Sequence, residues 1–473
     1  MHLNLIIDGE ERHASGRHVT TLFNPATEEP FADVAAAGLA DVHDAARGAQ
    51  RAFEQEWRDL APGRRAGVLF GIARLIREHL EELAQLETLN IGKPIADARD
   101  EVGLGARVFE YYAGALSTFC GQTIPVARRG FDFTLRQPMG VVVAVVPWNF
   151  PFPIACWKVA PALAAGNCVV LKPASLSPLT ALCLGVLALE AGLPGGVLQV
   201  LSGAGGEIGD ALVQHPLVRK ISFTGSTEVG AHIMRLAAPG ITRVSLELGG
   251  KSPNIVFADS EVDTAAASSP MSVFANAGQD CCARSRVFVE RSVFDRFVEK
   301  FLETTRRLVV GDPAQAETQI GPLVSRAQRE QVGRYLEGAK DRTIVGAERP
   351  PGAGWFIRPA VVLGCEPDDQ IWREEVFGPV VCIRPFDDEG QMLAEVNDSP
   401  YGLSGSIWTN DLKRALRVAR RVESGVLSVN SHSSVHVEAP FGGFKRSGLG
   451  RDLGMHALEG YTETKNVFIA EDD

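Results

Sequence analysis

The strongest constraint on the fold is an unbroken apolar, β-branched run from Val141 to Val146, which ends at Pro147. A run without polar alternation is typical of a strand buried on both faces, as in a parallel sheet covered by helices. Further strands are predicted at Cys168 to Leu171 and at Lys220 to Phe223, with helical patterns between them. Strands that alternate with helices predict an α/β fold with a parallel, doubly wound sheet.

The second half of the chain repeats this alternation. A chain of 473 residues is longer than one hydrophobic core normally supports, so two domains are expected. The economical prediction is a second α/β domain after the first. Its expected strands are Arg286 to Val289, Val380 to Ile383 and Val426 to Val429, and its expected helices are Val262 to Gly278, Phe294 to Leu308 and Asp411 to Val422.

Two segments fit neither predicted sheet. In the first, Phe131, Phe133 and Leu135 alternate with polar residues, which is typical of a strand with one apolar side. The second, Tyr461 to Ile469, mixes polar and β-branched residues. Each segment is predicted to form one arm of an exposed hairpin. Because exposed strands with an apolar side need cover, a partner subunit is expected there.

Charge and cysteine content argue against several classes of protein. The formal net charge is −11, so attraction to nucleic acid or to an anionic membrane is not expected. The first ten residues lack the layout of a signal peptide, and no run approaches the ~20 apolar residues of a membrane span. A cytoplasmic protein is therefore predicted. The eight cysteines are scattered and no pair has zinc-ligand spacing, so no metal site is predicted.

One cysteine lies where a reactive side chain would be presented. Cys281 falls in the stretch Asn-Ala-Gly-Gln-Asp-Cys-Cys-Ala-Arg, residues 276–284, between a predicted helix and a predicted strand. Turns between rigid elements often carry functional side chains. On its own, however, a cysteine is more often buried and inert than catalytic. Cys281 becomes a candidate nucleophile only with support from other residues.

Two polar residues at strand ends supply candidates for that support. Glu247 ends an apolar strand and is followed by Leu248 and two glycines, so its carboxylate is expected to project into a crevice. Asn149 follows the first buried strand, where proline and aromatic neighbours indicate a fixed amide. Each also has an ordinary alternative, a surface glutamate and a polar turn residue.

Residues 223–230 read as a strand, a turn and a helix. The helix N-terminal amides after Gly225 and the hydroxyl of Ser226 are suited to hold a pyrophosphate. The segment lacks the G-x-G-x-x-G fingerprint, so its spacing alone does not establish a dinucleotide site. Lys172 ends another strand and is either a ribose or phosphate contact or an ordinary strand-end lysine.

Seven short motifs occur in a fixed order along the chain. They are Pro147 to Pro151, Leu171 to Ala174, Phe223 to Thr227, Leu246 to Lys251, Gly278 to Cys281, Glu375 to Pro379 and Pro440 to Gly443. Together they resemble the aldehyde dehydrogenase superfamily, from about Asn24 to Asn466. A chance match of seven ordered motifs is very improbable, although each motif alone is modest evidence.

The resemblance implies three parts. The first is an NAD(P)-binding domain with a Rossmann-like sheet, expected at residues 1–119 and 140–249. The second is an α/β catalytic domain at residues 250–460. The third is a small β-hairpin oligomerisation element at residues 120–139 and 461–473, which matches the two exposed strands. Members of the family usually form homodimers or homotetramers, so a homo-oligomer is expected.

The resemblance also implies catalytic roles. Cys281 would attack the aldehyde carbon, because a thiol is nucleophilic even with a small thiolate fraction. The Asn149 amide and the Cys281 backbone N–H would hold the oxyanion. After hydride transfer to the cofactor, Glu247 would activate water to hydrolyse the thioester. Relatives that pass the acyl group to coenzyme A generally lack a carboxylate at this position, so Glu247 favours release of the free acid.

The implied cofactor is NAD or NADP. Ser175 bears on the choice, because many NAD-preferring relatives carry a glutamate at this position that would repel a 2′-phosphate. A serine would tolerate that phosphate, so NADP is expected to be accepted. Matching cofactor positions are Trp148, Lys172, Gly225 and Ser226 on the adenosine and pyrophosphate side, and Glu375 and Phe377 on the side of the nicotinamide ribose.

The substrate is a small-molecule aldehyde of unspecified structure. Phe150, Trp157 and Phe441 match positions that line an aldehyde tunnel, which implies an apolar or aromatic wall. No arginine replaces Trp157, which argues against an acidic semialdehyde.

The nearest resemblance within the family is to betaine-aldehyde and aminoaldehyde enzymes. Asn90, however, stands where those relatives often carry an aspartate, so an amine-binding anion is expected to be missing. His432 and His436 fall in a loop that borders the substrate mouth in relatives. One interpretation is that they shape specificity, and the preferred one is a pair of surface histidines.

Two rival functions remain open at the level of sequence. One is a coenzyme A-acylating semialdehyde dehydrogenase, which product analysis with and without coenzyme A would distinguish. The other is a non-enzymatic structural descendant of the fold, against which the intact set of Cys281, Glu247 and Asn149 argues.

Overall fold

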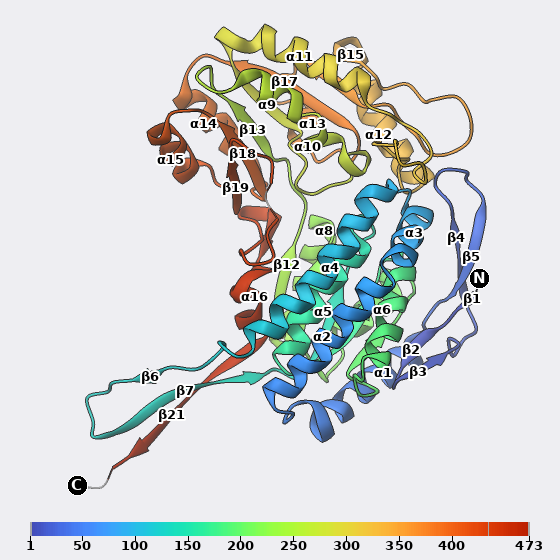
Figure 1. Cartoon of the computed structure of the whole chain (residues 1–473), viewed down its shortest axis with the longest axis vertical. Coiled ribbons are helices and arrows are strands. Elements are labelled where there is room, and N and C mark those ends of the chain that lie inside the picture. The colour runs from blue at the N-terminus through green and yellow to red at the C-terminus, as the bar shows by residue number, and fades with distance from the viewer. Residues whose placement is uncertain (1, 434, 472–473) are drawn as a thin grey trace.

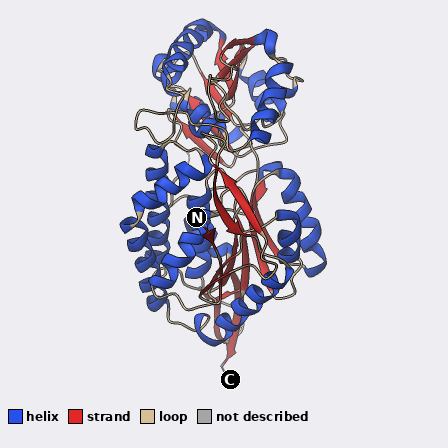
Figure 2. Ribbon diagram, turned by 90° about the vertical axis from the view of Figure 1, so that its right-hand side faces the viewer, coloured by secondary structure: helices blue, strands red, loops and turns tan. Residues whose placement is uncertain are grey.

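The protein consists of two open sheets in two lobes, each covered by helices, with a long strand pair extending from one end (Figures 1 and 2). This computed structural model describes residues 2–433 and 435–471. Among these residues, no helix combines the length and the apolar character needed to cross a lipid bilayer.

The first lobe is built on an eight-stranded sheet whose five central strands are parallel. The predicted buried run becomes a central strand, β8, and its side chains are buried because helices cover both faces. In spatial order the strands are β20 (Gly448–Leu449), β12 (Arg243–Glu247), β11 (Val218–Thr224), β8 (Val141–Val145), β9 (Cys168–Lys172), β10 (Leu198–Val200), β2 (Leu5–Ile7) and β3 (Glu10–Arg12).

Helices cover both faces of this sheet, as the predicted doubly wound fold requires. One face carries α5 (Pro151–Ala164) and α6 (Leu179–Glu190), backed by α2 (Pro62–Glu78), α3 (Leu80–Ile91) and α4 (Ile95–Ala115). The other face carries α1 (Leu39–Ala52), α7 (Asp210–Val213) and α8 (Thr227–Ala237). A small separate sheet consists of β1 (His2–Leu3), β5 (Pro30–Ala35) and β4 (Val19–Phe23). The prediction of an α/β fold is confirmed.

The second lobe is a seven-stranded, mostly parallel sheet. Its strands, in spatial order, are β15 (Thr343–Val345), β16 (Ala360–Leu363), β17 (Val380–Phe386), β14 (Arg286–Glu290), β13 (Pro253–Val256), β18 (Ser404–Trp408) and β19 (Val426–Val429). Its helices are α9 (Val262–Ser268), α10 (Met271–Phe274), α11 (Phe294–Arg307), α12 (Arg326–Gly338), α13 (Gln370–Arg373), α14 (Glu389–Asn397) and α15 (Leu412–Arg421). The predicted second α/β unit is therefore present.

The prediction of one helix from Val262 to Gly278 is wrong. The segment is broken into α9, α10 and a 3-10 turn, Ala275–Gly278. Pro270 lies between α9 and α10 and has no N–H to continue the helical bonds. Asn276 and Ala277 then adopt left-handed backbone angles, with φ of 51° and 55°. The chain thereby leaves the helix just before the nucleophile turn.

The two segments that fitted neither sheet pair with each other. β7 (Gly130–Pro138) and β21 (Thr462–Ala470) run antiparallel, and β6 (Thr123–Ile124) adds a short third strand to β7. Figure 1 shows this arm extending away from both lobes. The predicted element reaches residue 473, but residues 472–473 lie outside the part of the chain that the structure describes.

The buried side chains form two cores, one for each lobe. The segment from Val437 to Tyr461, which includes α16 (Gly454–Gly460), contributes to the first core rather than the second. Strand β20 also pairs with β12 in the first sheet. Residues 250–460 were expected to form one catalytic domain, so the packing differs from that division: the chain returns to the first lobe before the arm.

Candidate active site

Two cavities meet at Cys281. The first, of about 1090 Å³, lies between the lobes and reaches from the ends of β8 and β11 to α12. The second, of about 620 Å³, lies on the other side of the cysteine and has mostly apolar walls. Cys281 and Thr224 line both cavities. We refer to them as the cofactor cavity and the substrate chamber.

The nucleophile turn packs tightly against two glycine positions. A Cβ on Gly250 would lie 2.2 Å from the carbonyl oxygen of Cys281, and a Cβ on Gly278 would lie 2.1 Å from that of Gly378. Gly278 also has a φ of 71°, a left-handed conformation that favours glycine. Within the turn, the Cys282 N–H donates to a carboxylate oxygen of Asp280 at 2.8 Å. The turn is therefore held from both ends.

Asn149 is held by three hydrogen bonds, one from its side chain and two to its backbone. Its Nδ2 donates to the carbonyl of Gln279 at 2.9 Å. Its backbone carbonyl accepts from Lys93 Nζ at 3.0 Å and from Asn276 Nδ2 at 2.9 Å. Nδ2 keeps a second hydrogen, and no hydrogen bond among the described residues uses the backbone N–H of Cys281. Two donors therefore remain for an oxyanion beside the sulfur.

Glu247 ends β12 and is only 5% exposed. Its Oε2 has no hydrogen-bond partner among the described residues. Burial and the nearby Asp452 carboxylate raise the pKa of Glu247 well above its usual range, and Lys158 partly opposes this. The carboxylate faces the substrate chamber, where a water molecule would be its natural partner.

The Cys281 sulfur lies beside a second thiol and a carboxylate. Contact with Cys282, followed by burial, raises the pKa of Cys281 well above that of an ordinary thiol. Asp280, Cys281 and Cys282 bring three metal-ligating atoms within 4.8 Å of one another. All three come from one turn that also carries the candidate nucleophile, and the absence of a metal remains a prediction.

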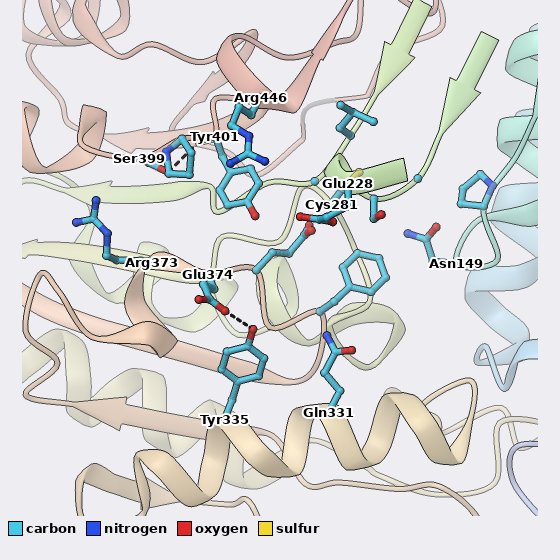
Figure 3. A pocket seen from close by; sticks show the side chains of 18 of the residues that line it. Asn149, Glu228, Cys281, Gln331, Tyr335, Arg373, Glu374, Ser399, Tyr401 and Arg446 are labelled. Carbon is cyan, nitrogen blue, oxygen red and sulfur yellow. Dashed lines mark hydrogen bonds between the residues drawn. The ribbon is translucent and has the colours of Figure 1, made fainter. Parts of the chain in front are cut away.

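The cofactor cavity receives most of the residues predicted to bind the cofactor. Ser226 caps α8, with its hydroxyl accepting from the Val229 N–H at 3.3 Å, so the first turn of that helix opens into the cavity. Figure 3 shows Cys281 and Asn149 opposite the side chains of Tyr335 and Gln331, which belong to α12. The predicted residues that line the cavity are Trp148, Gly225, Ser226, Glu375 and Phe377.

Two predicted cofactor residues do not line this cavity, namely Lys172 and Ser175. Lys172 ends β9 next to β8 and donates to the carbonyl of Pro173 at 3.0 Å. Burial lowers the pKa of its ammonium group to about 8. Ser175 is half-buried in the turn that follows. Both residues lie at the end of a strand next to the cavity.

Glu375 connects the cofactor cavity to the chain that joins the two sheets. Its Oε1 accepts from the Gly250 N–H at 2.9 Å, and a Cβ on Gly249 would lie 2.2 Å from Oε2. Burial raises the pKa of Glu375 to about 7. Nearby, the rings of Trp148 and Phe377 meet edge to face at 5.2 Å. Gly249 therefore leaves the space that the Glu375 carboxylate fills, and the Gly250 N–H fixes its orientation.

The substrate chamber contains all three predicted pocket residues, Phe150, Trp157 and Phe441. The rings of Trp157 and Phe441 pack edge to face, with their centres 5.3 Å apart. Leu104, Met271, Trp408 and Val435 extend the apolar wall.

Comparison with known proteins supports the same interpretation along the chain. The sequence model of the aldehyde dehydrogenase family matches residues 12–467. The chain belongs to the aldehyde dehydrogenase family. It is 42% identical over 479 residues to the phenylacetaldehyde dehydrogenase of Pseudomonas fluorescens, covering 98% of this chain and 95% of that protein.

Solved structures of the family superpose closely on this aldehyde dehydrogenase. The NAD⁺ complex of the Bacillus cereus aldehyde dehydrogenase has a TM-score of 0.98 at 39% identity, covering 100% of this chain and 97% of that one. Betaine aldehyde dehydrogenase from Staphylococcus aureus, also with NAD⁺, has a TM-score of 0.96 at 36% identity, covering 98% and 94%. The protein is an oxidoreductase that converts aldehydes to acids with NAD or NADP.

The structure of this dehydrogenase corrects the interpretation of His432. It was expected on the surface, as its neighbour His436 is, but it lines the substrate chamber. Its Nδ1 lies 3.0 Å from the hydroxyl of Ser406, and its ring packs against Trp408 at 5.2 Å. Burial and then the Arg284 charge lower its pKa to about 3, so it is neutral at physiological pH. The sequence placed His432 in a loop at the substrate mouth, but it gave no sign that the side chain is partly buried in the chamber.

Arg284 is a residue that sequence reasoning missed. Its buried guanidinium donates to the carbonyl of Cys282, to Ser406 Oγ at 3.0 Å and to the carbonyl of His432 at 3.3 Å. It thereby links the nucleophile turn, strand β18 and the loop around residue 432. The only signal in the sequence was its position, three residues after the cysteine.

A carboxylate in the substrate chamber was also missed. Asn90 was expected to leave the site without an anion, and its amide donates instead to the carbonyl of Leu176 at 2.7 Å. Glu101 nevertheless lines the chamber. It is paired with the buried ammonium of Lys93, which also lies 4.2 Å from the centre of the Phe150 ring. Because the pair is internally neutral, it offers little charge to a substrate.

The raised pKa of Cys281 predicts a particular reactivity. Alkylation by iodoacetamide needs the thiolate, so the modification rate of Cys281 should still be rising above pH ~8.5, the ordinary cysteine value. Mass spectrometry of the alkylated peptides measures this, with the exposed Cys120 as an internal reference. A plateau for Cys281 near neutral pH would contradict the prediction.

Proposed function

We propose that Cys281 is the nucleophile, that Asn149 and the Cys281 N–H hold the oxyanion, and that Glu247 activates water. The observation that carries this proposal is the position of Cys281 at the junction of the two cavities. Only a residue at that junction can contact an aldehyde carbon from one side and expose it to a hydride acceptor on the other. Asn149 lines the cofactor side and Glu247 the substrate side.

The reaction can be followed at the Cys281 sulfur. The thiol gives its proton to solvent water as sulfur bonds to the aldehyde carbon, and the carbonyl oxygen becomes an oxyanion beside the two free donors. Removing one such donor typically costs about 3 kcal/mol of transition-state stabilisation. When the oxyanion re-forms the carbonyl, the carbon loses hydride and an acyl-thioester remains on Cys281. Water, deprotonated by Glu247, displaces the sulfur and releases the carboxylic acid.

The cofactor cavity fits a dinucleotide. Its volume of about 1090 Å³, the N-terminus of α8 and the buried Glu375 carboxylate match the needs of a pyrophosphate and a ribose. Gly225 and Ser226 would hold the phosphates, and Glu375 and Phe377 the nicotinamide end. When bound, the nicotinamide supplies the hydride acceptor.

Hydrolysis to the free acid is favoured over transfer to coenzyme A. Glu247 faces the substrate chamber with a carboxylate oxygen that has no partner among the described residues. A base in that position promotes attack by water on the thioester. Acid formation that strictly required coenzyme A would overturn this assignment.

We further infer an aromatic aldehyde as substrate. Trp157, Phe441 and Trp408 line the chamber, and the single carboxylate of the wall near Phe150 is neutralised by Lys93. A cationic aminoaldehyde would find no free anion beside Phe150, whereas a phenyl ring would be enclosed by aromatic edges and faces. The related phenylacetaldehyde dehydrogenase favours the same substrate class.

Homo-oligomerisation through the arm and a cytoplasmic location complete the proposal. Phe131 and Ile469 face each other across β7 and β21 and are 48% and 54% exposed, so the arm has an apolar side that a second copy would cover. Eight free cysteines fit a reducing compartment.

Glu247→Gln should separate the two halves of the reaction. We expect steady-state turnover to fall roughly 10²–10⁴-fold, because general-base assistance to hydrolysis is lost. One equivalent of reduced cofactor should still form in a rapid burst, because hydride transfer precedes hydrolysis. Stopped-flow absorbance of the reduced cofactor measures both phases, with Cys281→Ala as the control that loses both. A missing burst would instead assign Glu247 to activation of the thiol.

Trp157→Ala should weaken the use of aromatic aldehydes selectively. Loss of the ring contact is expected to cost about 1.5–3 kcal/mol, or roughly 10–100-fold in kcat/KM for phenylacetaldehyde. A short aliphatic aldehyde such as propanal should lose far less. His436→Ala, an exposed site in the adjoining loop, is the matched control. Equal losses for both aldehydes would contradict an aromatic binding role.

Ser175→Glu should change the cofactor preference. A carboxylate at the end of β9 would repel a 2′-phosphate, so KM for NADP should rise while use of NAD is retained. Ser175→Ala preserves a small neutral side chain and should keep the original ratio. Initial rates with both cofactors measure the effect. An unchanged ratio in the glutamate variant would mean that residue 175 lies far from the 2′ position.

A further inference from the structure

A third cavity, of about 520 Å³, opens at the opposite end of β11 and β12 from the catalytic residues. It lies beside the base of the arm and is bordered by Met139 and Tyr461. Four basic side chains line it, namely Lys220, Arg243, Arg451 and His456. None of them has a role in the proposed reaction. We call this space the basic cavity.

Lys220 is the most unusual of the four. Its side chain is only 4% exposed, yet its ammonium group makes no hydrogen bond or ion pair with any residue that the structure describes. The centre of the Tyr461 ring lies 5.0 Å from Lys220 Nζ. Burial lowers the pKa of Lys220 to about 8. The stem of Lys220 is buried while its ammonium group borders the basic cavity, so its hydrogen-bond acceptors must come from whatever occupies that cavity.

The remaining side chains leave the basic cavity with an excess of positive charge. Arg451 donates only to backbone carbonyls, those of Gly443 at 3.2 Å and Gly450 at 2.6 Å. Arg243 is paired with Glu463 at 3.0 Å, but its side chain is about half exposed. The side chain is therefore free to rotate toward a ligand in the cavity. One carboxylate, Glu459, lines the cavity, and it lies 4.0 Å from Arg136.

The basic cavity is separate from the substrate chamber. In the parallel register of β11 and β12, Lys220 pairs with Arg243, and Thr224 pairs with Glu247 at the catalytic end. Between these ends lies the buried ion pair of Lys158 and Asp452, with Nζ and Oδ2 at 2.9 Å. A ligand bound at Lys220 would therefore not overlap with the aldehyde.

We propose that the basic cavity binds a small oxyanion, a phosphate or a carboxylate, with Lys220 as its principal contact. A tetrahedral or planar oxyanion supplies the acceptors that the ammonium lacks, and charge-assisted hydrogen bonds of this kind are among the stronger ones in proteins. Arg243 and His456, on the rim, are placed to complete the shell. The site lies beside the arm, so occupancy would also brace the junction between β21 and the first sheet.

Thermal unfolding of the full-length protein in inorganic phosphate tests the proposal. Saturating NAD⁺ is included throughout, so that phosphate cannot act through the cofactor cavity, and ionic strength is held constant with sodium chloride. We expect Tm to rise in a saturable manner by roughly 2 °C. A parallel titration with acetate shows whether phosphate or carboxylate is preferred.

Lys220→Met should abolish the saturable rise, whereas Lys340→Met, which removes an exposed lysine, should leave it intact. If Lys220→Met does not fold, Arg243→Gln replaces it, and weaker binding is then the expected result. Calorimetry at pH 8 should also detect proton uptake on binding, because an anion favours the charged form of Lys220. The proposal is overturned if wild-type protein shows no saturable response or if neither variant weakens it. Neither result depends on aldehyde oxidation.

Discussion

The whole site depends on how closely the chain that joins the two sheets approaches the nucleophile turn. β12 of the first sheet ends at Glu247, and β13 of the second begins at Pro253. Between them, Gly249 and Gly250 have no side chains, and the space is taken by Glu375 and by the carbonyl of Cys281. Any Cβ there would separate the lobes. The same contact therefore positions Glu247, Cys281 and Glu375, the proposed base, nucleophile and nicotinamide-side carboxylate, relative to one another.

Burial at this junction raises the pKa values of the acidic groups around Cys281. The pKa values of Glu247 and Glu375 are raised because burial removes water from their charged forms, and that of Cys281 is raised by its contact with Cys282 and then by burial. The charges that remain nearby are mostly paired, Lys158 with Asp452 and Lys93 with Glu101. Burial thus disfavours the charged form of each of these three acidic groups.

Much of this arrangement could be predicted from sequence, and the reasons differ by element. The strand at Val141 was predictable because both of its faces are buried, which leaves an uninterrupted apolar run. The ordered motifs brought Cys281, Glu247 and Asn149 together before any geometry was known. The helix prediction at residues 262–278 failed at two places: Pro270 is a visible helix-breaking residue, whereas the left-handed φ of 55° at Ala277 is not indicated by its residue type. The contacts of His432 and Arg284 could not be predicted from the sequence, because both residues hydrogen-bond to Ser406 in β18. Ser406 lies more than a hundred residues from Arg284 along the chain.

The two cavities around Cys281 have opposite characters, and this difference helps to order the reaction. The wide cofactor cavity has polar walls at α8 and α12, whereas the substrate chamber is mostly apolar except near Glu247. In the proposed reaction, hydride leaves the carbon toward the cofactor side, and water approaches it from the side of Glu247. An apolar chamber filled by the tail of the aldehyde admits little water elsewhere. Hydrolysis would therefore be directed through Glu247, so that the proposed base at the end of β12 is sufficient for product release.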